Sequence, residues 1–465
     1  MLRVTFKDPF VWVTACWVGA IITIAPPASA QLPATAEVSP PLQALVAQAE
    51  RAGLRVLSSR HLILVTDRPP READGLHELP GIFDEAFAVW CKHYELDPAD
   101  HADWQALGCL VVDRDRFRAA GLLPDEVPDF TNGYCWFHRF WLADQSNPDY
   151  RRHLLLHEGV HAFTTTLLKL NTPTWYTEGI AEFLATHRLV ATAPRFQLTP
   201  IPAAASDVEQ LGRIETIARL RAAGSVPSLD EVFQLRPTLH GTIASYASAW
   251  AAVAFLAGHP RYAKALATAE RGPLDASFTT RLSSVPQWHP AAARRDFDAF
   301  TADVDYGYDF DRMVIDWSPG KPMEAITTKL PLSFSVRPDH GWQNTGWRLR
   351  AGWQYQLRAS GRCVVGTVDG LDGPTVLESE ADGVSIDWYR GRPIGRLLAA
   401  QWNATPTDSN RAAFKILGEG TTITLTATQD GPLFLQINLQ PGNRMKAHEA
   451  LTVSLTTQLQ PPASD

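Results

Sequence analysis

The five residues from His157 to His161 have the types and the spacing that metal chemistry needs. They read H-E-G-V-H, and the surrounding stretch, 149–171, is rich in apolar residues and contains no proline. On a helix, residues four apart share a face, so His157 and His161 can direct their imidazoles to one ion such as zinc. Glu158 can then act as a general base beside that ion. The alternative is a helix with two core histidines bonded to neighbouring carbonyls.

The residues that follow favour the metal interpretation. Asn171-Thr172-Pro173 ends the first helix, and 174–183 again has helical spacing. A helix–turn–helix of this length folds back and can present Glu178 to the same ion. Two histidines and one glutamate leave the fourth position of a zinc ion open for water, as a catalytic site requires.

These two stretches resemble the gluzincin metallopeptidases, the clan of thermolysin and the zinc aminopeptidases. The matching residues are H-E-x-x-H at 157–161 and W-x-x-E-G-x-A-E at 175–182. The resemblance runs from about 54 to 317 and is strong over 150–185. It implies that the Glu before Gly-x-Ala, Glu178, is the third zinc ligand. Glu182, one turn further along, is interpreted as a carboxylate that orients a histidine. In the alternative assignment, Glu182 is the ligand and Glu178 its support.

A small sheet is expected before the metal helix, as in gluzincins, where an edge strand above the metal pairs with the substrate backbone. The stretch 133–142 is the candidate for that edge strand. Tyr134, Trp136 and His138 could then form a substrate subsite. The alternative is an aromatic-rich hairpin of the core.

The stretch 186–318 is predicted to be mainly helical and to form a lobe opposite the sheet. Related enzymes need a donor for the developing oxyanion, often Tyr or His. Tyr246 and His240 are the candidates, although a packed tyrosine at the start of a helix would give the same pattern.

The N-terminal residues 1–30 have the pattern of a secretory signal peptide. An apolar run follows Arg3 and Lys7, and Ala28-Ser29-Ala30 supplies a cleavage site. We therefore expect an exported protein, periplasmic or secreted, with no membrane span after cleavage. Export permits disulfides, so a pair among Cys91, Cys109 and Cys135 and a set of buried free thiols are both open.

The length and the net charge of the chain limit its domain organisation and its class of partner. The chain has 465 residues, more than one core usually holds, and its net charge of −8 is spread along it. This distribution argues against a nucleic-acid partner. The expected organisation is α+β: a metallopeptidase domain over 31–185 and 186–318, a linker at 319–331, and an all-β sandwich or jelly roll over 332–460.

The last of these regions alternates strands and turns. It resembles the jelly-roll domain of galactophilic calcium lectins, at G-W-Q-N-T-G (341–346), A-G (351–352), R-P-I-G (392–395) and G-P-L-F-L-Q-I-N (431–438). Those lectins bind calcium in the loop after the last of these stretches. Here that loop, 438–450, lacks most acidic ligands, and Ca²⁺ requires several hard oxygens. The resemblance therefore implies the fold, but not calcium-dependent sugar binding. A carbohydrate-bearing surface is still a candidate partner.

The sequence thus predicts an exported zinc metallopeptidase with a peptide or protein substrate and Zn²⁺ as cofactor. The Gly-x-Met-Glu-Asn strand of the aminopeptidases is missing before His157, which favours an endopeptidase or a specialised peptidase. The rival hypothesis is a non-catalytic surface or carbohydrate-binding protein in which the zinc is structural.

Overall fold

The computed structural model describes nine segments of the chain. These are 42–69, 75–190, 196–208, 212–236, 242–322, 332–370, 373–403, 413–444 and 450–457. The predicted signal peptide, most of the predicted linker and His240 lie outside the described residues.

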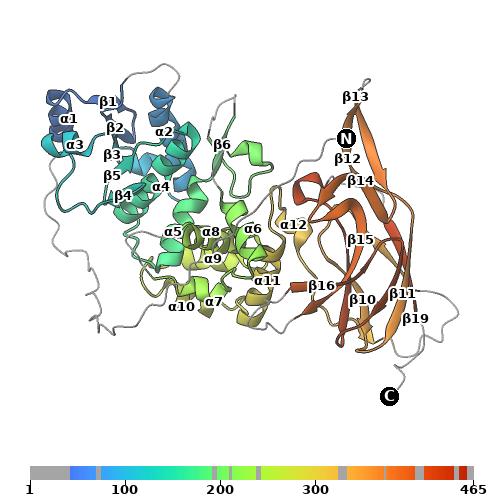
Figure 1. Ribbon diagram of the computed structural model, residues 1–465. Helices are drawn as coiled ribbons and strands as arrows, with labels where there is room; N and C mark the ends of the chain where they lie inside the picture. Colours follow the sequence, from blue (N-terminus) through green and yellow to red (C-terminus); the bar gives the residue numbers. More distant parts are fainter. Residues whose placement is uncertain are drawn as a thin grey trace, which may run out of the picture. The chain divides into compact units, whose positions relative to one another are not determined.

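Five short strands form the first sheet, in the order β1-β2-β3-β5-β4 (Figure 1). Strands β2, β3 and β5 are parallel, whereas β1 and β4 run antiparallel to their neighbours. The strands are β1 (Arg55–Ser58), β2 (Leu62–Thr66), β3 (Ala106–Val111), β4 (Gly133–Trp136) and β5 (Arg139–Ala143).

The stretch 133–142 is a hairpin and not the single strand expected. Strand β4 forms the edge of the sheet, and β5 is an inner strand with buried residues. Phe137 has φ 55°, so the backbone turns there through the left-handed region. His138 follows it in the same turn. The stretch is therefore a hairpin, as in the alternative, but its first arm lies at the edge of the sheet and is only partly buried.

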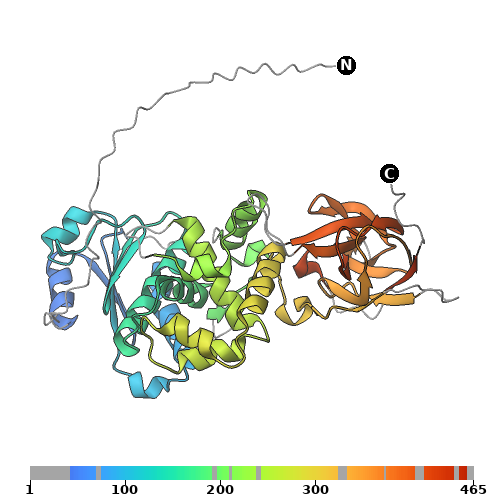
Figure 2. The ribbon, with the colours of Figure 1, turned by 90° about the horizontal axis from the view of Figure 1, so that it is seen from below.

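Helices cover both faces of this sheet (Figures 1 and 2). On one face, α1 (Leu42–Arg51) and α3 (Arg114–Ala119) bury Leu45, Ala49 and Phe117 in one core cluster. On the other face, α2 (Leu79–His93) and α4 (Pro148–Leu167) contribute to a larger core. The helix that carries the H-E-x-x-H residues is thus α4.

Two glycines allow the close packing of α4 and of α5 (Thr174–Ala185). A Cβ at Gly159 would lie 2.4 Å from the ring of Phe83 in α2. A Cβ at Gly179 would lie 2.5 Å from the carbonyl oxygen of Ala249 in α8 (Ile243–Gly258). Both distances are too short for a real side chain, so these glycines fix how α4 and α5 sit in the core.

The predicted helical lobe is present after α5, and it shares the larger core with the sheet. Buried residues of this cluster run from Leu62 to Tyr306. The further helices are α6 (Arg213–Ala222), α7 (Leu229–Phe233), α9 (Ala263–Glu270), α10 (Phe278–Ser284), α11 (Pro290–Asp303) and α12 (Phe310–Met313). Short elements are β6 (His187–Leu189), β7 (Phe196–Leu198), η2 (Leu76–Glu78), η3 (Pro98–His101) and η4 (Ala205–Asp207).

The C-terminal region is built of β-strands, as predicted. One sheet has the order β14-β15-β18-β10-β8 with β16 beside β15, and the other has the order β17-β11-β19-β9. A third pair, β12-β13, forms a hairpin. The strands are β8 (Lys321–Pro322), β9 (Leu332–Val336), β10 (Gln343–Leu349), β11 (Gln354–Ser360), β12 (Cys363–Gly370), β13 (Gly373–Ser379), β14 (Asp382–Tyr389), β15 (Arg392–Asn403), β16 (Ala413–Glu419), β17 (Thr422–Thr426), β18 (Gly431–Ile437) and β19 (Leu451–Thr457), with η5 (Pro441–Asn443) after β18.

The strands of this region enclose their own core and also pack against the helical lobe. Along β11, buried and more exposed residues alternate, as in a sheet with one face inward. A separate cluster joins Ala299 and Ile315 of the lobe side to Trp342, Trp402 and Phe434. Hydrogen bonds join the two parts as well: Tyr389 to Asp305 (3.1 Å) and Arg390 to Asp303 (2.8 Å).

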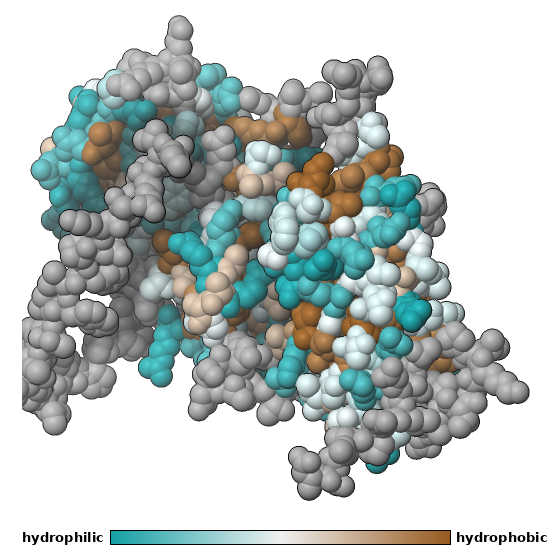
Figure 3. All heavy atoms as spheres, turned by 45° about the vertical axis from the view of Figure 1, so that its right-hand side comes forward, coloured by the Kyte–Doolittle hydropathy of each residue, from teal (hydrophilic) through white to brown (hydrophobic). Residues whose placement is uncertain are grey.

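Cys91, Cys109 and Cys135 are free thiols, so no disulfide joins them. Within the described segments, no helix combines the length and the apolar character needed to span a bilayer. Hydrophobic patches on the face in Figure 3 are separated by hydrophilic side chains. The exposed large hydrophobic residues belong to several elements and loops, as is normal for a folded protein.

Candidate metal centre

Two facing helices bring histidines and carboxylates together. Helix α4 carries His153, His157 and His161 on one face, and α5 carries Glu178 and Glu182 one turn apart. The side chains form two groups, His157–His161–Glu178 and His153–His157–Glu182, and in each the donor atoms lie within 4.8 Å of one another. Each group has a donor set that could hold a metal ion.

The first group has the spacing of three ligands around one ion. Nε2 of His157 lies 3.1 Å from Nε2 of His161 and 3.5 Å from Oε2 of Glu178. Nε2 of His161 lies 3.4 Å from the same oxygen. Ligand atoms about 2.05 Å from a tetrahedral zinc are separated by about 3.3 Å. Among the described residues, this buried oxygen of Glu178 has no hydrogen-bond partner, which a metal ion would supply. The residues present therefore fit a zinc ion.

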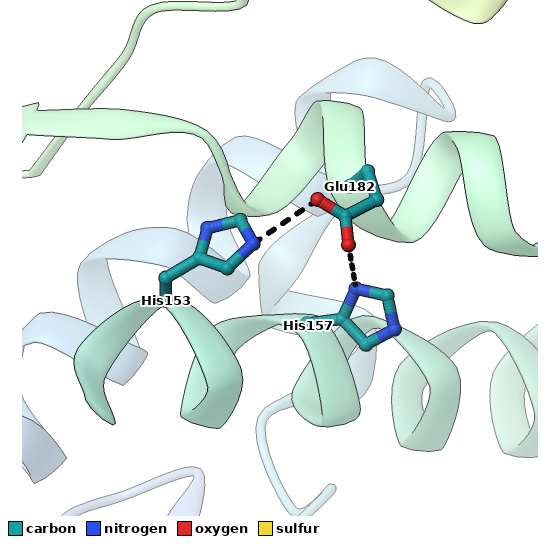
Figure 4. A group of neighbouring side chains, drawn as sticks. All are labelled: His153, His157 and Glu182. Carbon is teal, nitrogen blue, oxygen red and sulfur yellow. Dashed lines mark hydrogen bonds and ion pairs between the residues drawn. The ribbon is translucent and has the colours of Figure 1, made fainter. Parts of the chain in front are cut away.

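The second group is already neutralised by an arginine. Glu182 is 2 % exposed, and it accepts hydrogen bonds from Nε and Nη2 of Arg213 at 2.8 and 2.6 Å. Its oxygens also lie 3.1 Å from Nε2 of His153 and 3.3 Å from Nδ1 of His157 (Figure 4). The contact with Nδ1 is an ion-pair distance without hydrogen-bond alignment. Since Arg213 already engages both oxygens, the second group is the poorer cation site.

The charges in the cluster favour a bound cation. Burial lowers the pKa of His157, but the neighbouring carboxylates of Glu178 and Glu182 outweigh this effect and raise the pKa to about 10. Burial raises the pKa of Glu178, but His161 and His157 outweigh it and lower the pKa to about 2. Burial raises the pKa of Glu182, but Arg213 and His153 hold it well below its usual range. The carboxylates thus stay ionised beside the imidazoles, where a metal ion can replace the proton.

Glu158 lies against the edge strand of the first sheet. It is 6 % exposed, and burial raises the pKa of its carboxyl group. A Cβ at Gly133 would lie 2.4 Å from Oε1 of Glu158, so the β4 backbone crosses this carboxylate directly. Cys135, two residues on, packs against the same core as α4.

The backbone of β4 is oriented to bind an extended chain. Ala143 N–H donates to Asn132 O (2.8 Å), which makes these two a hydrogen-bonded pair. Pairs alternate along an antiparallel ladder, so Gly133 and Cys135 direct their N–H and C=O groups away from β5, toward the open edge.

The predicted aromatic subsite does not lie on this side of the sheet. Tyr134 and Trp136 alternate with Gly133 and Cys135, and they pack against the core on the opposite face. The ring of Tyr134 stacks on Trp141 at 6.4 Å between centroids. His138 lies in the turn after β4. Alternation along β4 puts Tyr134 and Trp136 on one face, but the sequence alone does not tell which face meets the metal helix.

Tyr246 is the candidate oxyanion donor that the described structure brings to the site. It lies near the start of α8, with its ring 6.0 Å from the imidazole of His157. Burial, followed by the charge of Glu178, raises the pKa of its phenol, so it is protonated at neutral pH and can donate. The other candidate, His240, falls outside the described residues.

Three residues at the site were missed in the sequence. Arg213 reaches Glu182 from 31 positions away and also lies 5.8 Å from the ring of Tyr246. His153 precedes His157 by one helical turn, which is a signal the spacing did contain. Gly133 carries no functional group, so only its contact with Glu158 identifies it.

No protein-family model matches this chain, and neither does any curated protein. Among solved structures, the C-terminal region is similar to one described as "EclA N-terminal domain; PllA-like lectin". The identity is 18 %, and the match covers 27 % of this chain and 95 % of that one, with a TM-score of 0.18. A similarity this weak supports no statement about function.

Proposed function

We propose that this protein is a zinc-dependent peptidase in which His157, His161 and Glu178 hold the metal. The observation that carries the proposal is the triangle of donor atoms, 3.1–3.5 Å apart, with a buried carboxylate oxygen that has no hydrogen-bond partner among the described residues. When bound there, zinc would polarise the scissile carbonyl and lower the pKa of a water molecule.

The chain's own residues would supply the other parts of the reaction. Glu158 accepts the proton of the attacking water and transfers it to the leaving amine. Glu182, fixed by Arg213, keeps the ring of His157 in its ligating orientation. The outward N–H and C=O groups of β4 bind the substrate backbone as an added strand, which supports a peptide as the substrate class. Tyr246 donates to the carbonyl oxygen as negative charge develops on it.

A structural zinc site is the rival function, and the composition of the group argues against it. Structural zinc sites are closed by four protein ligands, whereas the group around Nε2 of His157 comprises three among the residues that the structure describes. Glu158 and Tyr246 beside it are the acid–base and donor groups that hydrolysis needs. We also propose that the protein acts after export, because residues 1–30 have the pattern of a signal peptide.

The decisive experiment separates metal binding from chemistry. Glu158→Gln keeps the size of the side chain but removes the base, so zinc content should match wild type while peptide hydrolysis falls at least about 10²-fold. Hydrolysis of a mixed peptide library is read by mass spectrometry, and zinc by elemental analysis. Glu126→Gln, an exposed site, is the control for loss of one carboxylate and should leave both unchanged. Wild-type protein that holds zinc but cleaves nothing in a broad library would favour the structural-zinc rival.

A further inference from the structure

A cavity of about 250 Å³ lies where the helical lobe meets the C-terminal strands. It is distinct from the metal centre, and nothing in the proposed hydrolysis uses it. Its walls come from the end of α6, the end of α11, and strands β14, β15, β16 and β18 with the loop that follows β18. A space of this size holds a small molecule, not a polymer chain.

The lining of this cavity contains more arginines than carboxylates. Arg221, Arg390, Arg392 and Arg444 line it together with Asp303, which pairs with Arg390, and Arg392 pairs with Glu419 outside the lining. The whole chain carries a net charge of −8, so this concentration of cations is local and against the general trend. Clefts lined by one sign of charge attract ligands of the opposite sign.

Two of these arginines have no carboxylate within ion-pair distance among the described residues. Arg221 donates only to the carbonyl oxygens of Ala302 (2.6 Å) and Val304 (3.1 Å). Arg444 is 6 % exposed and donates to four backbone carbonyls, those of Pro338, His340, Ile437 and Leu439. Its Nε atom is buried and has no partner within the described segments.

Buried charges without counter-charges are expensive, and an anion in the cavity would offset that cost. We propose that this cavity binds a small anionic ligand, whose carboxylate or phosphate group faces the arginines. The bidentate geometry of guanidinium groups suits both kinds of anion.

The apolar part of the lining indicates what the rest of the ligand is like. Trp342 and Phe414 stack with ring centroids 4.4 Å apart and 22° between planes, and Leu398 and Ile416 lie beside them. A lining with an aromatic and aliphatic part and a cationic part fits a ligand with one apolar face and one acidic group, such as a sugar acid or a sugar phosphate. The loop after β18 supplies Arg444 here, so the cavity favours an anion over calcium.

The test is binding to the full chain at constant ionic strength, with inorganic phosphate, glucuronate and glucose as probes in calorimetry. Glucuronate and glucose share a ring and differ in the carboxylate, so glucuronate or phosphate should bind and glucose should not. Binding of phosphate alone would identify a phosphate-bearing ligand, and binding of glucuronate a carboxylate-bearing one. Absence of saturable binding of either anion, or equal binding of glucose and glucuronate, overturns the proposal.

Variants assign the binding to this cavity. Arg221→Gln and Arg392→Gln should each weaken the anion at least about tenfold, the loss expected for one charged hydrogen-bond partner. Arg219→Gln removes the same charge from an exposed position on the same helix and should change nothing. Arg392 lies on the strand side of the cavity. If Arg221→Gln fails to fold, anion binding by Arg392→Gln still tests the proposal. Wild-type affinity in a folded Arg392→Gln protein contradicts the proposal.

Discussion

Gly133 and Glu158 leave no room for a side chain between them: a Cβ at position 133 would lie 2.4 Å from Oε1 of Glu158. The residue is therefore glycine because the edge strand passes over the carboxylate that we assign as the base. This contact ties the strand proposed to bind substrate to the group proposed to move the proton.

Replacement of Gly133 by alanine should impair hydrolysis without loss of zinc. The added methyl group displaces Glu158 or β4, because its three nearest atoms all belong to Glu158 and to none of the three proposed ligands. We expect kcat/KM to fall at least about tenfold, because a displacement near 1 Å is enough to disturb a catalytic geometry. Gly81→Ala is the control, since a Cβ there meets nothing within 4 Å and φ is not positive. Wild-type activity in Gly133→Ala would separate β4 from catalysis.

The two glutamates of α5 should respond differently to substitution. Glu178→Ala should abolish zinc binding at equimolar zinc, because it removes a proposed ligand. Glu182→Ala should keep a weaker site, about 10- to 100-fold lower in affinity, because it loses the group that orients His157. It should also lose roughly 3–5 kcal/mol of stability, since Arg213 is left buried without its counter-charge. Elemental analysis and urea unfolding measure both effects. Loss of zinc in Glu182→Ala alone would reverse the assignment.

The part of the site that could be predicted was local in sequence. His157, His161 and Glu178 follow from the spacing on one helix and from a helix that returns, both of which are short-range patterns. Arg213 could not be found that way, because it reaches Glu182 across 31 positions and depends on tertiary packing. Tyr134 and Trp136 were assigned to the site because they are aromatic. Alternation along a strand, however, does not show which face of the sheet meets α4. The C-terminal strands were predictable because one buried face leaves a period of two.

Metal removal should destabilise the protein. Without zinc, the carboxylates and imidazoles of the cluster stay close together but lose the ion that fits between them. A ligand that binds only the folded state stabilises it by about 2.7 kcal/mol when its concentration is 100 times its Kd. Chelation should therefore lower Tm, and added zinc should restore it, in wild type but not in His161→Ala. A Tm that changes with neither chelator nor added zinc would contradict a zinc site in the folded protein.

The pH dependence of stability should include a contribution from Asp339. Burial raises the pKa of this carboxyl, but hydrogen bonds from Arg337 and His340 outweigh it and lower the pKa. A lowered native pKa means that the ionised form stabilises the fold above the unfolded pKa of about 3.9. This contribution is lost as the pH falls through the native value. Asp339→Asn should be less stable than wild type at pH 7, and the difference should shrink below about pH 4. A difference that is constant with pH would assign the effect to packing.

Arg444 should make the C-terminal region independent of calcium. Its guanidinium holds the carbonyls of Pro338 and His340 together with those of Ile437 and Leu439, and so joins the loop before β10 to the end of β18. A bound cation in this place would have to displace a buried arginine. We therefore expect calcium and a calcium chelator to leave Tm within about 1 °C of each other, and no calcium-dependent galactose binding in calorimetry. Arg444→Met keeps much of the volume but leaves buried carbonyls unpaired, at a cost of about 1–3 kcal/mol for each one that water cannot reach. Arg358→Met, at an exposed position on β11, is the matched control and should be near neutral. Calcium-dependent sugar binding by the wild type would show that the loop keeps a metal site despite the arginine.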